Sequence, residues 1–175
     1  MSTTKWTIDP THSEVSFKVK HLVISTVTGY FKTFEGSAES DSEDFDGATV
    51  SFSADINSID TNQKDRDNHL KSADFFDAEN HPKLTFSGKI KNSGGDYKLV
   101  GDLKMRETTK NVELDVDFGG VAGDPYGQTK AGFEIEGKIN RKEFGLSWSA
   151  VTEAGSVVVS DQVRLILNVQ LVKQA

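Results

Sequence analysis

Histidine is the residue type in this chain best suited to acid–base or metal chemistry, and four are present: His12, His21, His69 and His81. No two of them have the spacing that would place two metal ligands on one helix face, and there is no His-Glu-x-x-His motif. His12 and His81 each lie close to a proline, so we expect them to form hydrogen bonds within turns. The sequence therefore predicts no metal site.

An enzyme would have to be assembled from residues scattered along the chain. The sequence has no cysteine, no Gly-x-Ser-x-Gly motif and no glycine-rich phosphate loop. The remaining acid–base candidates are His12 with Asp9 and His69 with Asp67. The second pair belongs to a charged run whose members, three and four residues apart on a helix, can pair with each other. An enzyme is therefore the alternative, and a protein without catalytic residues is the expectation.

Two polar segments are predicted to be mobile loops. Residues Ser37 to Gly47 are acidic and could be mistaken for a calcium loop, but Phe45 or Ala48 falls where that loop needs an oxygen ligand. Residues Ser149 to Asp161 are rich in small side chains. We expect this second segment to lie at the mouth of the fold, where it could gate access.

Composition limits the class of protein. The chain has 175 residues, which we assign to a single domain over residues 1–175. A net charge of −7 argues against a nucleic-acid partner. No stretch is long and apolar enough to span a membrane or to act as a signal peptide, so we expect a cytoplasmic protein, or a periplasmic one if a leader preceded this sequence.

Alternation of apolar and polar residues with a period of two is the dominant pattern, and it predicts half-buried strands. Seven segments show it, and the less regular stretch from Leu22 to Phe34 adds an eighth strand. The seven segments are 14–20, 50–56, 84–90, 97–105, 112–118, 131–139 and 163–171. Their turns are hairpin-like, which favours an antiparallel sheet.

Helical signal is confined to about ten residues, 62–71, where Thr61 is the expected N-cap and Leu70 is expected to face inward. One short helix cannot cover so large a sheet. The sheet must therefore bury its own apolar face as a sandwich or a barrel, and closure into a barrel also removes exposed edges.

Three glycines, Gly88, Gly101 and Gly137, share the parity of the apolar residues in their strands and are expected to point inward. They could allow the strands to bend, or they could leave internal volume for a ligand. The 11 phenylalanines would line such a cavity without polar groups. The residues expected to contact a ligand are Phe17, Val19, Phe31, Phe34, Phe75, Phe76, Phe86, Gly88, Gly101, Leu103, Phe133 and Ile135.

The order of several motifs resembles the YceI family of lipid-binding proteins along nearly the whole chain. The segments that carry the resemblance are 6–13, 15–21, 28–31, 34–36, 58–61, 66–70, 74–77, 81–86 and 140–146. Segment 105–111 departs from the family pattern, which usually has glycine at the position of Glu107 and often proline at that of Asn111. We therefore expect a different turn there.

The resemblance implies a lipocalin-like, eight-stranded antiparallel barrel that holds a polyisoprenoid, an isoprenoid quinone or a related amphiphile, with no cofactor and no catalytic residue. The alternatives are an enzyme acting on a lipid or quinone, and a structural or stress-related protein with a solid core. The family has bacterial members in both compartments. Ile166 is an apolar residue at an outward position, which is compatible with a homodimer.

Overall fold

The computed structural model describes residues 3–21, 24–42, 44–146 and 159–174. Within them lie eleven strands and one α-helix, α1 (Lys64–Lys71). The strands are β1 (Thr4–Ile8), β2 (Glu14–His21), β3 (Ser25–Phe31), β4 (Phe34–Ser40), β5 (Thr49–Asp55), β6 (Ile59–Asp60), β7 (Lys83–Ser93), β8 (Asp96–Met105), β9 (Thr108–Gly123), β10 (Thr129–Asn140) and β11 (Val159–Lys173). No helix in the described part of the chain is long and apolar enough to cross a membrane.

The strands close into a barrel because β11 pairs with both ends of the sheet. One edge of β11 pairs with β10, and the other pairs first with β2 and then with β1, where Trp6 lies opposite Lys173. β1 also pairs with β4, which completes the order β1, β4, β5, β7, β8, β9, β10, β11. The barrel therefore has eight positions around its axis, and the predicted antiparallel eight-stranded barrel is confirmed.

Three of these eight positions hold broken strands: β1 with β2, β3 with β4, and β5 with β6. The prediction that Ser37 to Gly47 is a loop is wrong for residues 37–40, which lie in β4. β4 alternates as the other strands do, but after Phe34 the residues on its inward face are small: Gly36, Ala38 and Ser40. A hydrophobicity pattern built from large side chains misses such a strand.

The second predicted loop, Ser149 to Asp161, lies mostly outside the described residues. Its last three residues, 159–161, belong to β11 rather than to a loop. The pairing of β11 with β2 begins at Val159 opposite His21, and its register shifts between Val159 and Val163 before it continues regularly to Asn168.

The helix forms where it was predicted, but with a different N-cap. The Gln63 side chain accepts a hydrogen bond from the Arg66 amide, so Gln63 is the N-cap and Thr61 is not. Thr61 is instead buried and donates to Asp67, while the Arg66 guanidinium donates to Thr61. The Arg66 and Asp67 side chains therefore both turn back onto Thr61.

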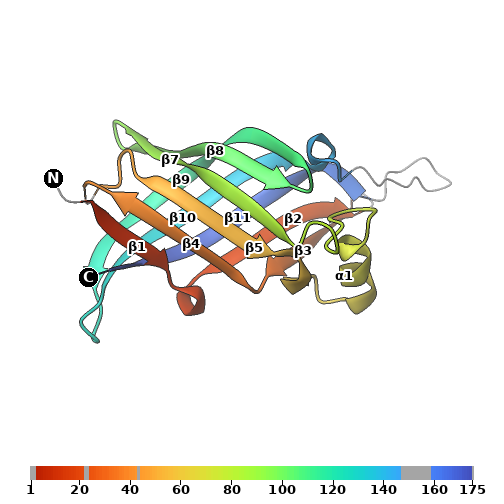
Figure 1. The fold of residues 1–175 in the computed structure, drawn as a ribbon, viewed down its shortest axis with the longest axis horizontal. Coiled ribbons are helices and arrows are strands. Elements are labelled where there is room, and N and C mark those ends of the chain that lie inside the picture. The colour runs from red at the N-terminus through yellow and green to blue at the C-terminus, as the bar shows by residue number, and fades with distance from the viewer. Residues whose placement is uncertain (1–2, 22–23, 43, 147–158, 175) are drawn as a thin grey trace.

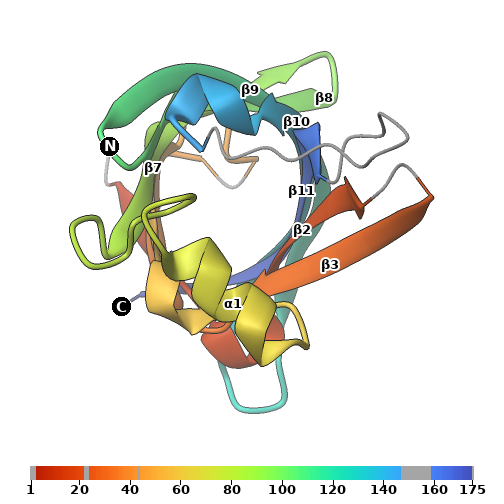
Figure 2. The ribbon, with the colours of Figure 1, turned by 90° about the vertical axis from the view of Figure 1, so that its right-hand side faces the viewer.

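The helix covers one end of the barrel. Figure 1 shows α1 at the end opposite both chain termini, and Figure 2, seen from that end, shows it lying across part of the opening. We refer to α1 and the residues that follow it, Lys64 to Ala78, as the cover. This arrangement gives the barrel two different ends, one partly covered by α1 and one beside the termini.

The inward glycines allow close approach of backbone and rings rather than leaving empty volume. Gly88 and Gly101 are opposite each other on β7 and β8, and a Cβ on Gly101 would lie 2.4 Å from the Gly88 Cα and 2.8 Å from the Phe86 ring. At Gly137 a Cβ would lie 2.1 Å from a methyl carbon of Leu114. The prediction that these three positions leave room for a ligand is therefore wrong.

Gly101→Ala is expected to lower the free energy of unfolding by about 2 kcal/mol or more, because the added methyl meets backbone atoms that cannot rotate away. Gly132→Ala is the matched control, since nothing lies within 4 Å of its Cβ position, and it should change stability by less than about 0.5 kcal/mol. Urea unfolding of both variants measures the difference. Equal stabilities would contradict the close approach of β7 and β8.

Candidate functional site

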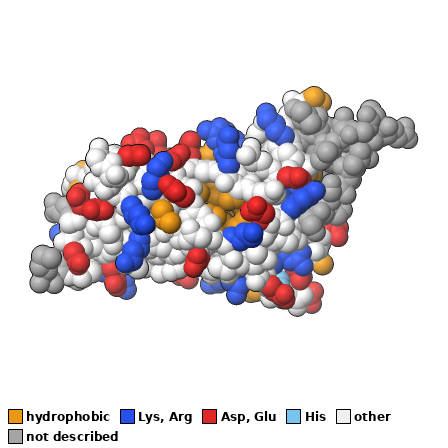
Figure 3. Space-filling view, turned by 90° about the horizontal axis from the view of Figure 1, so that it is seen from above, with side chains coloured by type: hydrophobic (Ala, Val, Ile, Leu, Met, Phe, Trp, Pro, Cys, Tyr) orange, Lys and Arg blue, Asp and Glu red, His pale blue; other side chains and the backbone are white. Residues whose placement is uncertain are grey.

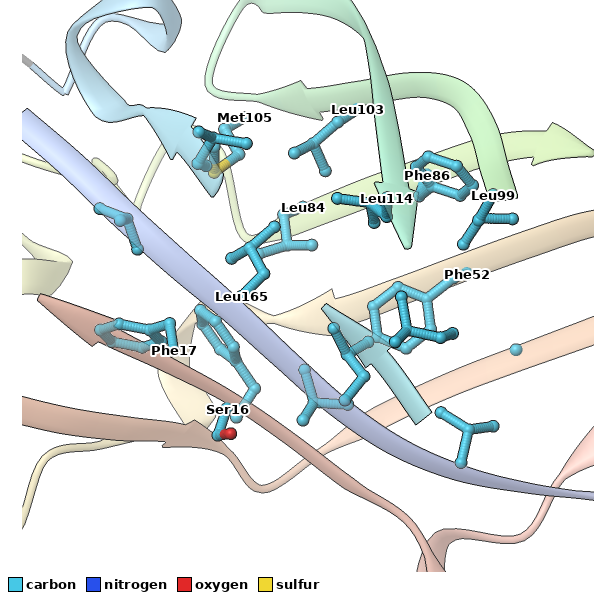
Figure 4. A pocket seen from close by; sticks show the side chains of 18 of the residues that line it. Ser16, Phe17, Phe52, Leu84, Phe86, Leu99, Leu103, Met105, Leu114 and Leu165 are labelled. Atoms are coloured by element: carbon cyan, nitrogen blue, oxygen red, sulfur yellow. The ribbon is translucent and has the colours of Figure 1, made fainter. Parts of the chain in front are cut away.

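The barrel encloses an apolar cavity of about 190 Å³. Its walls are the inward side chains of the strands, together with Leu70, Phe75 and Phe76 of the cover. Figure 4 shows side chains of this wall, among them Phe17, Phe52, Phe86, Leu103 and Leu165. Because hydrocarbon side chains make up nearly all of the wall, the cavity favours an apolar ligand.

Most of the residues predicted to contact a ligand do line this cavity. They are Phe17, Val19, Phe31, Phe75, Phe76, Phe86, Leu103, Phe133 and Ile135. Phe34, Gly88 and Gly101 are not among the lining residues. Phe34 packs its ring against Phe52 at 6.2 Å, and the two glycines lie beneath the Phe86 ring.

Other wall residues were not predicted individually although they share the same inward parity. They include Val15, Val50, Phe52, Leu84, Leu99, Leu114, Leu165, Leu167 and Val169. Strand periodicity was sufficient to find them, since each alternates with a polar neighbour. What periodicity does not give is which inward side chains border empty space and which pack against one another.

The surface of the barrel is charged, as expected for an exterior that alternates with an apolar interior. Figure 3 shows Lys, Arg, Asp and Glu side chains interspersed on one face, with hydrophobic side chains visible inside a hollow near its centre. The mixture of signs gives no uniformly charged patch on this face. The contrast between the outside and the hollow again indicates an apolar site inside the molecule.

Arg141 is the charged side chain among the described residues that line the cavity. Only 3 % of the residue is exposed. Its guanidinium donates to the carbonyls of Leu146 at 2.6 Å, Ser160 at 2.9 Å and Val159 at 3.3 Å. It therefore joins the start of β11 to the segment that follows β10, as well as placing a positive charge on an apolar wall.

Burial lowers the pKa of Arg141 from its ordinary value, and Asp161, 3.9 Å away, partly opposes this shift. The guanidinium carbon also lies 5.6 Å from the centre of the Phe75 ring, within the range of a cation–π contact. Phe75 belongs to the cover, so this contact links the cover to the barrel wall.

Arg106 provides a second link between cover and barrel. It occupies the β8–β9 turn with a φ of 54°. Its Nη1 donates to the carbonyls of Gly145 at 2.9 Å and of Ala73 and Phe75 at 3.3 Å. The segment whose sequence departs from the family pattern therefore carries a residue that holds the cover in place.

The candidate catalytic residues do not form one site. His12 Nδ1 lies 2.8 Å from Asp9 Oδ2 in the turn between β1 and β2, where Asp9 also contacts Lys130 of β10 at 3.0 Å. His69 bonds Asp74 at 2.9 Å within the cover, at the other end of the barrel. Neither histidine lines the cavity, and no group of three or more metal-ligating side chains occurs in the described ranges.

Asp9→Asn is expected to lower stability by about 1–2 kcal/mol at neutral pH, because it weakens a partly buried charge-assisted network. Hydrogen bonds from His12, Thr11 and Lys130 hold the pKa of Asp9 well below its ordinary value. The carboxylate therefore stabilises the fold above pH ~4, and this contribution is lost as the pH falls further.

The melting temperature of Asp9→Asn should accordingly approach that of the unmodified protein between about pH 4 and pH 2. Asp117→Asn, at an exposed position of β9, is the control and should show no convergence of this kind. If the melting temperatures of Asp9→Asn and the parent differed by the same amount at every pH, the ionised carboxylate would not be the cause of the lower stability.

Comparison with known proteins shows which domain family this chain resembles and which relatives it has. The chain matches the YceI-like domain over residues 6–171. It is 38 % identical to a UPF0312 protein of Staphylococcus epidermidis over 162 residues, which cover 92 % of this chain and 93 % of the relative.

Two solved structures share the fold. The YCEI protein of Campylobacter jejuni superposes with a TM-score of 0.75 at 32 % identity, over 89 % of this chain and 90 % of the other. A polyisoprenoid binding domain from Saccharophagus degradans, implicated in plant cell wall breakdown, superposes with a TM-score of 0.72 at 14 % identity, over 97 % of this chain and 98 % of that one. The second likeness shows the fold alone.

Proposed function

The chain belongs to the family of YceI-like domains, and from this premise we propose that its barrel binds a long-chain isoprenoid lipid, such as a polyprenyl chain or an isoprenoid quinone, and sequesters or transports it. The observation that carries the proposal is the cavity, whose described wall is hydrocarbon apart from three serines and Arg141. The polyisoprenoid-binding domain with the same fold supports it. A barrel with a solid core would have no such cavity.

The cavity favours a flexible chain over a rigid polar molecule. Each buried methylene contributes about 0.8 kcal/mol before the cost of immobilising the chain. Such a ligand needs few hydrogen bonds, which agrees with a wall that offers few. Phe, Leu and Val side chains from facing strands would contact it on all sides.

We place the polar head of the ligand at the cover end and its tail toward the termini. Arg141 supplies a positive charge at the cover end, which suits an oxygen-bearing head group such as a quinone carbonyl or a phosphate. The other end has aromatic side chains that suit a hydrocarbon tail. The cover would then separate the head group from water.

A binding role is favoured over catalysis on the same lipid. The two histidine–carboxylate pairs lie at opposite ends of the barrel and outside the cavity wall. A general acid or base must reach the reacting atoms of a bound substrate to within hydrogen-bonding distance. Neither pair meets this condition for a ligand inside the barrel.

Organic extraction of the purified protein, followed by mass spectrometry, tests the proposal. We expect an isoprenoid lipid or quinone at close to one molecule per chain. Protein that is empty and also fails to take up geranylgeraniol or menaquinone added in detergent would overturn the proposed function. Double replacement of His12 and His69 by Ala should leave the extracted lipid chemically unchanged, whereas an altered product would favour the enzyme.

A further inference from the structure

At the end of the barrel away from the cover, one phenylalanine from the acidic segment packs into the centre of a cluster of aromatic rings. Phe45 is fully buried, with 0 % of its surface exposed. Its ring lies 5.0 Å from that of Trp6, 5.1 Å from that of Phe133 and 5.5 Å from that of Phe118. Phe133 lines the cavity, so Phe45 stands directly behind the cavity wall at this end.

The residues around Phe45 are tied to the neighbouring strands. The Tyr97 hydroxyl donates to the Asp44 carbonyl at 2.8 Å, and the Asn92 amide donates to Asp46 at 3.0 Å. The Gly47 amide donates to the Ile90 carbonyl at 2.8 Å. These contacts to β7 and β8 hold the Phe45 ring across the end of the barrel.

The backbone at Phe45 indicates that this placement is imposed by its surroundings. Its φ of 62° lies in the left-handed region, which residues with a bulky side chain rarely occupy. Such a conformation persists where the surrounding contacts over-determine it. Here the contacts are the tilted packing of the ring against Trp6, its edge-to-face packing against Phe118 and Phe133, and the hydrogen bonds of the flanking residues.

The cavity is small for a ligand that is a long chain. At about 190 Å³, it is only slightly larger than an engineered cavity of about 150 Å³ that binds benzene, and it falls below the range of about 300–1,000 Å³ typical of ligand pockets. A long chain therefore needs additional length along the barrel. The cover limits that length at one end and the Phe45 ring at the other.

We propose that Phe45 is the residue that sets the length of apolar chain the barrel accepts, acting as a plug at the tail end of the cavity. This inference rests on the proposed function. Removing the Phe45 ring would leave empty space behind Phe133, and the Phe133 ring could move into it, so that the cavity lengthens and admits further isoprene units. Each added methylene would then be buried rather than left in water.

Competition binding with farnesol, geranylgeraniol and solanesol, measured by displacement of a fluorescent prenyl probe, tests the plug. In Phe45→Ala we expect the affinity for solanesol relative to farnesol to rise at least about tenfold, which corresponds to burying only a few more carbons. Phe45→Gly relieves the left-handed backbone and provides a second variant should the alanine form fail to fold. Phe45→Leu keeps a smaller side chain at this position, so its affinity for solanesol relative to farnesol should lie between that of the parent and that of Phe45→Ala.

Phe144→Ala is the matched control, because Phe144 is equally buried, at 1 % exposure, but lies in the turn 141–144 on the side of the cover rather than behind Phe133. It should lower stability without changing the preference for chain length. If folded Phe45→Gly has the same affinity for solanesol relative to farnesol as the parent, Phe45 does not limit chain length, while the proposed function stays intact. Absence of binding by the unmodified protein would instead overturn the proposed function itself.

Discussion

Leu165→Trp is expected to lower the affinity for an isoprenoid chain by about tenfold to hundredfold. Leu165 lies in the middle of β11 and its side chain points into the cavity (Figure 4). A Trp ring there would occupy much of a cavity of about 190 Å³, so that a ligand could enter only by forcing other side chains aside. Overpacking of this kind costs about 1–3 kcal/mol, and that cost falls on the complex rather than on the free protein.

Two further measurements separate a blocked cavity from a damaged fold. The melting temperature of ligand-free Leu165→Trp should be close to that of the parent, because the ring fills empty space. Ile166→Trp is the control, since Ile166 is adjacent on the same strand and does not line the cavity. It should bind the chain normally. Undiminished binding by folded Leu165→Trp would mean that the ligand lies elsewhere.

Arg141→Met is expected to lower the free energy of unfolding by about 3–5 kcal/mol. The substitution removes three hydrogen bonds from a charged donor and leaves the carbonyls of Leu146, Val159 and Ser160 without it, at a cost of about 1–3 kcal/mol for each buried acceptor that stays unsatisfied. For a chain of 175 residues this corresponds to a fall in melting temperature of about 6–20 °C.

Lys142→Met provides the control for Arg141→Met. Lys142 is the next residue, its side chain is 40 % exposed, and its described ion pair is with Asp161 at 3.3 Å. Its loss should change stability by less than about 1 kcal/mol. Thermal unfolding followed by circular dichroism compares the two variants. If the melting temperatures of both variants fell by the same amount, the loss of the Arg141 hydrogen bonds would not be the cause of the destabilisation.

The architecture of this protein was largely predictable because it depends on the alternation of apolar and polar residues along each strand. Alternation placed residues such as Phe17, Leu103 and Phe133 on one face of the sheet, and the lack of a covering helix required that face to close on itself. These inferences use only the direction of side chains along a strand. They limited the fold to a sandwich or a barrel and identified most of the wall residues that the structure brings together, and the family resemblance favoured the barrel.

The details that shape the cavity were not predictable in this way. Parity placed Gly88 and Gly101 correctly on the inner face but did not show that the Phe86 ring lies over them. Phe45 stands alone among acidic residues and belongs to no periodic segment, so nothing in its neighbourhood indicated complete burial. The sequence analysis did not single out Arg141, because its carbonyl partners, which include Ser160 and Val159 of β11, are brought to it only by the fold.

A crystal structure of the protein with a brominated isoprenoid chain tests the central claim most directly, since anomalous scattering locates the bromine without prior assumptions. With bromine at the tail of the chain, we predict a single peak inside the barrel between the cover and Phe133, and continuous density from there toward Arg141. Bromine found only on the outer surface, in crystals whose protein had bound one chain per molecule in solution, would contradict the claim.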